Sequence, residues 1–230
     1  MPGRRPVSNP LALAVLACLW ERPMYPYEIT TTLKERGKED SIRLNFGSLY
    51  AVIKSLEKHG FIEAARTERA GNRPERVVYE ITESGRVEAR DWMRELIGRP
   101  AKEYPAFEAG LSMIGLLPPD EVASLLRERI SALDEELGRR TRMEEEAARL
   151  GLPELFVIES EYRKAMTEAE RTFAARLLER IESERLGGFR HWAEMHELIQ
   201  AGVPVIEAQL KLVQPHQSAG QPAKPEEKRR

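Results

Sequence analysis

The first hundred residues carry apolar side chains at the spacing of amphipathic helices, interrupted once by a strand-like stretch. Apolar residues recur at intervals of three and four along four segments, which predicts four helices. These helices are expected over residues 10–22, 26–36, 46–59 and 83–97, with Asn45 as the cap of the third. The third is the clearest, because its apolar residues fall at i, i+3, i+4 and i+7. They are Leu49, Val52, Ile53 and Leu56.

A hairpin is predicted between the third and fourth helices. Residues 61–68 alternate partly in polarity, and residues 76–82 are rich in β-branched and aromatic side chains. The segment between them contains glycine, asparagine and proline, which favour a turn. The resulting order is three helices, two antiparallel strands with a long tip, and a further helix. That order is the winged helix-turn-helix arrangement, expected over residues 8–99 in a mainly α protein.

The remainder of the chain is predicted to be helical. Two long segments, residues 119–150 and 154–186, are separated by a Gly-Leu-Pro break. In the first, apolar residues repeat with the 4-3-4 spacing of a narrow coiled-coil seam. We expect residues 104–213 to form a helical dimerisation and effector domain, and residues 214–230, which are almost without apolar residues, to be a disordered tail.

The apolar sides of the long helices leave two arrangements open. They can supply the surface on which two copies of the chain pair, or they can bury against each other within one chain. The seam of the first long helix consists of Leu126, Ile130, Leu133 and Leu137. Apolar residues near one side of the second are Ile158, Tyr162, Met166, Phe173, Leu177 and Ile181.

Charge is distributed unevenly along the 230 residues, although the net charge is only −2. Up to Arg76 the chain has 13 Lys and Arg against 9 Asp and Glu, whereas the rest has 23 against 29. A basic first third and an acidic remainder predict different roles for the two parts. The single cysteine, Cys18, excludes an intramolecular disulfide and is expected to be buried. No apolar run is long enough to span a bilayer, and we expect a cytoplasmic protein.

The third predicted helix has a second side that core packing does not explain. It carries small residues near its start and lysines further along, and it lacks large apolar side chains there. A helix with this shape can enter the major groove of duplex DNA, which is about 12 Å wide. Ser48 can bond a base edge or a phosphate, Tyr50 can bond a phosphate, and Lys54 supplies backbone charge. Arginines in the hairpin tip are suited to phosphate contacts.

Three stretches resemble the PadR family of winged-helix transcription regulators: PYEITTTL, GSLYAVIKSLEKHGFI and YEITESGRVEARDWM. The resemblance covers about residues 10–97 and includes the Leu49-Tyr50 pair and the Thr-x-x-Gly helix start at Thr82. In one departure, Pro26 stands where the family commonly has glycine, so a backbone N–H is missing at the start of the second helix. The resemblance implies DNA contacts at Tyr27, Ser48, Tyr50, Lys54, Arg69, Asn72 and Arg73.

We therefore expect a dimeric repressor of a double-stranded DNA operator, released by a small-molecule effector. A two-fold dimer would hold its two recognition helices about 34–36 Å apart, one turn of the duplex. Candidates to line an effector pocket are Trp20, Trp92, Met93, Met113 and Trp192, for each of which core packing is the alternative.

Other classes of function fit the sequence less well. It has no Gly-rich phosphate loop, metal-ligand spacing or nucleophile constellation, so we expect neither an enzyme nor a cofactor. A MarR-like winged-helix regulator remains an alternative, although its dimer helices would flank the winged domain on both sides. A winged-helix protein-docking module is another, and its binding would be insensitive to salt and independent of Tyr50.

Overall fold

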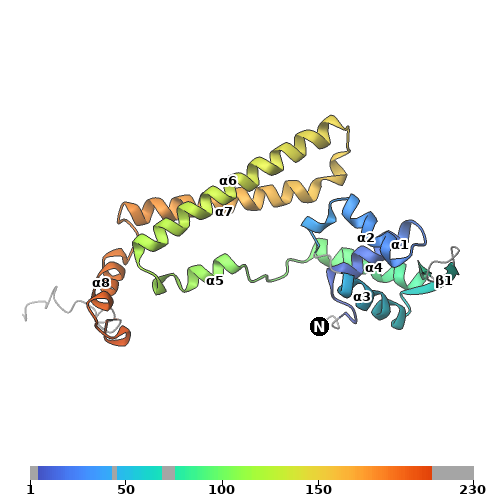
Figure 1. The fold of residues 1–230 in the computed structure, drawn as a ribbon, viewed down its shortest axis with the longest axis horizontal. Coiled ribbons are helices and arrows are strands. Elements are labelled where there is room, and N and C mark those ends of the chain that lie inside the picture. Colours follow the sequence, from blue (N-terminus) through green and yellow to red (C-terminus); the bar gives the residue numbers. More distant parts are fainter. Residues whose placement is uncertain (1–4, 43–45, 69–75, 209–230) are drawn as a thin grey trace, which may run out of the picture. The chain divides into compact units, whose positions relative to one another are not determined.

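The computed structural model describes residues 5–42, 46–68 and 76–208, and the chain divides into two compact units (Figure 1). Unit 1 spans Met1–Glu103 and unit 2 spans Tyr104–Arg230. The protein is mainly helical with one antiparallel hairpin, as the sequence predicts. Within the described residues, no helix is both long enough and apolar enough to cross a membrane.

Unit 1 has the predicted winged-helix order. Its elements are α1 (Pro10–Glu21), α2 (Pro26–Glu35), the 3₁₀ turn η1 (Lys38–Asp40), α3 (Phe46–Lys58), β1 (Ile62–Glu68), β2 (Arg76–Ile81) and α4 (Glu83–Gly98). Capping residues fix two of the helix starts: the Asn9 side chain accepts from the Leu11 N–H at 3.0 Å, and the Thr82 hydroxyl accepts from the Gly85 N–H at 3.1 Å. The cap predicted at Asn45 lies outside the described residues.

Helix α1 is the centre of the unit 1 core. Seven of its twelve residues are buried, so it is enclosed on most sides by the other helices and the hairpin. Cys18 is among them, and burial raises the pKa of its thiol to about 11. Helix α3 packs on this core with the four apolar residues that its sequence spacing predicts. The side of α3 that faces solvent is fixed as a result.

The turn between α1 and α2 pairs with the hairpin, which the sequence does not reveal. Met24 donates its backbone N–H to the Tyr79 carbonyl at 3.0 Å, and the Tyr79 N–H returns a bond to the Met24 carbonyl at 2.9 Å. This bridge adds a one-residue third strand beside β2. It ties the base of the wing to the residues that precede α2.

Unit 2 consists of helices arranged around a long hairpin (Figure 1). Its elements are α5 (Ala106–Ser112), η2 (Ile114–Leu116), α6 (Pro119–Arg149), η3 (Glu154–Phe156), α7 (Ile158–Glu182) and α8 (Phe189–Gln200). Helices α6 and α7 pack antiparallel within one chain. Ion pairs join them along their length: Arg127–Glu182 and Arg129–Glu170 at 2.5 Å, Lys164–Glu144 at 2.7 Å and Arg171–Asp134 at 2.9 Å.

The second long segment departs from its predicted form in two ways. It opens with the 3₁₀ turn η3 and ends at Glu182, because Glu184 adopts a left-handed backbone with φ of 55°. Its six predicted apolar residues also do not share one environment. Leu177 and Ile181 are buried against α6, whereas Ile158, Tyr162, Met166 and Phe173 are exposed.

A buried arginine continues the seam of α6. Arg140 follows Leu137 at the next position of the seam and is only 9% exposed. Its Nη2 pairs with Glu136 at 2.6 Å, while its Nε has no hydrogen-bond partner among the described residues. A buried donor without a partner is destabilising, since it loses its bond to water on folding.

Gly85 has no room for a side chain. A Cβ at this position would lie 2.0 Å from the Phe61 carbonyl oxygen and 2.9 Å from Cγ1 of Ile81. We predict that Gly85→Ala lowers the free energy of unfolding by about 2–3 kcal/mol, because the backbone must shift.

The control is Gly98→Ala in the same helix, where a Cβ meets nothing within 4 Å. It should stabilise by up to about 1 kcal/mol. Urea titration compares the variants, and equal stability would contradict the steric explanation.

Arg140→Met tests the cost of the buried arginine. The substitution keeps the length of the side chain and removes the unpaired N–H, and Glu136 retains an ion pair with Arg139. Because a buried ion pair is often no more stabilising than packed apolar side chains, we predict a gain of about 1 kcal/mol or more. Thermal unfolding at one protein concentration measures it, with exposed Arg139→Met as control. A clear loss of stability would show that Arg140 has a further partner.

Candidate nucleic-acid interface

Helix α3 has two chemically different sides. The buried side consists of Leu49, Val52, Ile53 and Leu56. The exposed side consists of Gly47, Ser48, Tyr50, Ala51, Lys54, Glu57 and Lys58. Tyr50 keeps 53% of its surface exposed although it stands beside the buried Leu49. The structure thus brings three of the predicted contact residues, Ser48, Tyr50 and Lys54, onto one accessible side of the helix.

Tyr27 lies in the first turn of α2 and is 61% exposed. Pro26 precedes it at the first helical position, where a missing N–H does not interrupt the helix. The backbone carbonyl of Tyr27 accepts a hydrogen bond from the Thr31 hydroxyl at 3.1 Å. This bond uses the backbone of Tyr27 and not its side chain. Tyr27 therefore presents its ring and hydroxyl at the start of α2.

Two tyrosines lie at the base of the wing, Tyr79 in β2 and Tyr25 on the turn before α2. Burial raises the pKa of Tyr79 in β2, with further contributions from Glu57 and Tyr50 of α3. Tyr79 therefore keeps its proton at neutral pH. On the neighbouring turn, the Arg76 guanidinium lies over the Tyr25 ring, 5.0 Å from its centroid.

Neither Tyr25 nor Tyr79 is among the contact residues that the sequence predicts. A tyrosine in a strand or before a helix has no distinctive sequence signal, and the proximity of these residues depends on the Met24–Tyr79 bridge. The tip of the wing holds the remaining predicted contacts. Arg69, Asn72 and Arg73 lie outside the described residues, and they stay predictions.

Of the three effector candidates in unit 1, the two tryptophans make local contacts and Met93 is exposed. Trp92 is buried in the core and has the Arg5 guanidinium 5.5 Å from its ring centroid. Trp20, at the end of α1, is approached by Arg86 and Arg90 of α4 at 5.0 and 5.1 Å. Met93 is exposed on α4. Trp92 thus packs in the core and Trp20 stacks with arginines at the surface, and these contacts do not form a common pocket.

The other two candidates lie in unit 2. The indole N–H of Trp192 in α8 donates to the Leu117 carbonyl at 2.8 Å, which holds α8 against the turn before α6. Met113 follows α5 and is exposed. An effector pocket built from these residues therefore remains a prediction.

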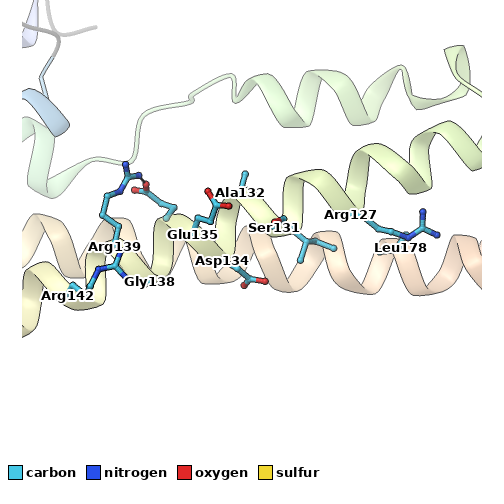
Figure 2. Close-up of a pocket in the computed structure, with 11 residues that line it drawn as sticks. Arg127, Ser131, Ala132, Asp134, Glu135, Gly138, Arg139, Arg142 and Leu178 are labelled. Carbon is cyan, nitrogen blue, oxygen red and sulfur yellow. Dashed lines mark ion pairs between the residues drawn. The ribbon is translucent and has the colours of Figure 1, made fainter.

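A hollow of about 840 Å³ runs along α6 beside Leu178 of α7 (Figure 2). Charged side chains of both signs line it, together with Ser131 and Gly138, which have little bulk. Arg139 pairs with Glu136 at its edge. The five effector candidates are not among its lining residues. Ile130, Ala132 and Leu178 add apolar surface, so the hollow is a helix surface of mixed polarity and not an enclosed apolar ligand chamber.

The fold and the α3 surface define a winged helix-turn-helix protein with a helical C-terminal unit. Residues 15–91 match the model of the transcriptional regulator PadR-like family. The match is thus confined to unit 1, in the same part of the chain as the sequence motifs that resemble this family. That family consists of regulators and not of enzymes.

Solved structures agree on the fold. Bacillus subtilis PadR in complex with operator DNA is 21% identical, with a TM-score of 0.62 over 75% of this chain and 99% of that one. The same protein in complex with p-coumaric acid is 20% identical, with a TM-score of 0.61 over 75% and 98%. The PadR-like regulator BC1756 of Bacillus cereus is 19% identical, with a TM-score of 0.51 over 78% and 99%. A comparison with curated proteins found no match.

Proposed function

We propose that this protein is a dimeric repressor that binds a specific DNA duplex through α3 and its wing and is released by a small molecule. The observation that carries the proposal is the exposed side of α3, where Ser48, Tyr50 and Lys54 lie opposite a fully packed apolar side. Tyr27 at the start of α2 and the tip residues Arg69, Asn72 and Arg73 complete the proposed contacts. Such a protein would work in the cytoplasm, where it meets the chromosome.

The chemistry of this surface fits the major groove. Small residues at the start of α3 let the helix approach the floor of the groove, while a lysine further along reaches the phosphates. Tyr50 and Tyr27 carry hydroxyls that can donate to phosphate oxygens. Sequence specificity would come from the few side chains near base edges, with Ser48 the first of them.

Two copies would be needed to cover a specific site. Exposed apolar residues gather around the tip of the α6–α7 hairpin, on η3 and one row of α7, and include Leu155, Phe156, Ile158, Tyr162 and Met166. Apolar residues in such number on one segment are typical of an interaction surface. The α6–α7 packing seen within one chain leaves this row unoccupied, so both arrangements left open by the sequence can hold together.

We propose a different role for each of the two units. Residues 8–99 would read DNA, and residues 104–213 would join the copies and sense an effector. A ligand can release the DNA only if it binds more tightly to a dimer whose two α3 helices do not match the spacing of the operator than to one whose helices do. Bacillus subtilis PadR has been solved with operator DNA and with p-coumaric acid, which supports both roles by analogy.

Lys54→Ala should weaken duplex binding for every sequence. Loss of one phosphate contact lowers the magnitude of the salt slope, d log K/d log[salt], by about 0.9. Fluorescence anisotropy between about 50 and 200 mM salt, on a duplex that the protein retains from its own genome, measures the slope. The control, Arg94→Ala, removes the same charge from an exposed position on α4. An unchanged slope for Lys54→Ala, or salt-independent binding by the native chain, would favour the protein-docking alternative.

Tyr50→Phe should weaken binding by about tenfold, since it removes one hydroxyl bond to a charged phosphate and keeps the ring. The same titration measures it. Tyr104→Phe, which changes an exposed tyrosine of unit 2, serves as the control. Native affinity in Tyr50→Phe would exclude the hydroxyl as a contact.

Met166→Glu should separate the dimer. Met166 is 53% exposed in the single chain, so the change is compatible with its fold, but a carboxylate would be buried unpaired between two copies. Light scattering should give the single-chain mass of 26.3 kDa, and operator affinity should fall at least about tenfold. Ser124→Glu, at an exposed position of α6, is the matched control. A Met166→Glu protein that stays dimeric would exclude this surface.

A further inference from the structure

A second hollow of unit 2 lies where α6 begins, α7 ends and α8 packs across both. Its volume is about 510 Å³, within the range of small-molecule sites in proteins. It is separate from the α3 surface and from the apolar row proposed to join two copies. Its floor and its rim differ sharply in chemistry.

The floor is apolar and buried. Pro119 and Ala123 of α6 and Ile181 of α7 form it, and all three are buried. Phe189 of α8 adds a half-buried aromatic ring, which lies edge-on to Trp192 with ring centroids 6.4 Å apart. This surface can cover a hydrocarbon or aromatic body, and the Phe189 ring can also attract a cation.

His196 is the buried polar group of the hollow. It is 9% exposed, and its Nε2 lies 3.0 Å from the carbonyl oxygen of Gly115. A carbonyl only accepts, so Nε2 is the nitrogen that carries the proton when the ring is neutral. Nδ1 is then an acceptor, and the ring's one hydrogen bond within the described residues is that of Nε2. The ring can therefore accept one N–H from a molecule in the hollow.

The rim is acidic. Asp120, Glu184 and Glu197 line it, and none of them has an ion-pair partner in the described part of the chain. The one basic residue of the lining, Arg127, is already paired with Glu182 at 2.5 Å. Three carboxylates and one arginine that is already paired line the hollow, so its side-chain charge favours a cation over a carboxylate or a phosphate.

We infer that this hollow binds an organic cation: an ammonium or guanidinium group on an apolar stem. The stem would lie on Pro119, Ile181 and Phe189, and the N–H groups would reach the rim carboxylates and Nδ1 of His196. Neither duplex binding nor dimerisation is needed for this binding, so it can be measured on the protein alone.

The same chemistry has two possible sources. One is a free amine. The other is the chain itself, because residues 209–230 include Lys224, Lys228, Arg229 and Arg230, each a cation on a hydrocarbon stem. The two sources differ in what removal of those charges does to binding of an added amine.

Isothermal titration of the full chain with 1-naphthylmethylammonium tests the inference. We expect one saturable site per chain, with affinity at least about tenfold above that for the neutral, isosteric 1-naphthylmethanol. The double variant Asp120→Asn/Glu197→Gln keeps the shape of the rim and should lose about tenfold in affinity. Glu194→Gln, an exposed carboxylate on α8 outside the hollow, should lose nothing. Circular dichroism confirms that each variant is folded.

A second full-length variant, Lys224→Gln/Lys228→Gln/Arg229→Gln/Arg230→Gln, distinguishes the sources. Tighter binding of the amine than in the native chain identifies the chain's own basic residues as competing occupants, and unchanged binding identifies a free amine. Equal affinity for ammonium and alcohol, or equal affinity in the rim variant, would overturn the inference. So would absence of binding in both the native chain and the neutralised variant.

Discussion

Packing of α3 against α1 is the constraint on which the rest of unit 1 depends. Leu49, Val52, Ile53 and Leu56 occupy one side of α3, and their burial leaves the helix a single orientation. If α3 rotated about its axis, these residues would become exposed to water. Each would then lose about 1.5–3 kcal/mol of the free energy gained by burial. The side that carries Ser48, Tyr50 and Lys54 must then face solvent, so a packing requirement of the core also determines the surface offered to a partner.

Contacts outside the core hold the wing beside that surface. The Met24–Tyr79 bridge ties β2 to the turn before α2, and the close approach of Gly85 to Phe61 sets where α4 leaves the hairpin. Tyr25 and Arg76 stack across the same turn. These contacts tie the start of α2 to the described base of the wing, and a fixed spacing of this kind suits a surface that must match the geometry of a duplex.

Sequence patterns predicted most elements because local signals agree with the fold. Asn9, Pro10 and Thr82 begin helices, glycines follow helix ends, and the apolar spacing of α3 identifies its buried side. The contacts between distant segments could not be predicted in the same way. The Met24–Tyr79 bridge joins backbone atoms and leaves no side-chain pattern, and the burial of Arg140 is hidden because its seam position looks like a charged helix surface.

The exposed row of α7 could not be predicted for a similar reason. Spacing alone does not say which apolar residues pack against α6 and which are left for a second copy.

The most direct measurement of the central claim is a dimethyl sulfate footprint on a bound operator, which reports guanine N7 in the major groove. Insertion of two α3 helices from a dimer should protect two groups of guanines whose centres lie about 10–10.5 base pairs apart. Bound protein that leaves every guanine N7 reactive, or protects only adenine N3 in the minor groove, would contradict it.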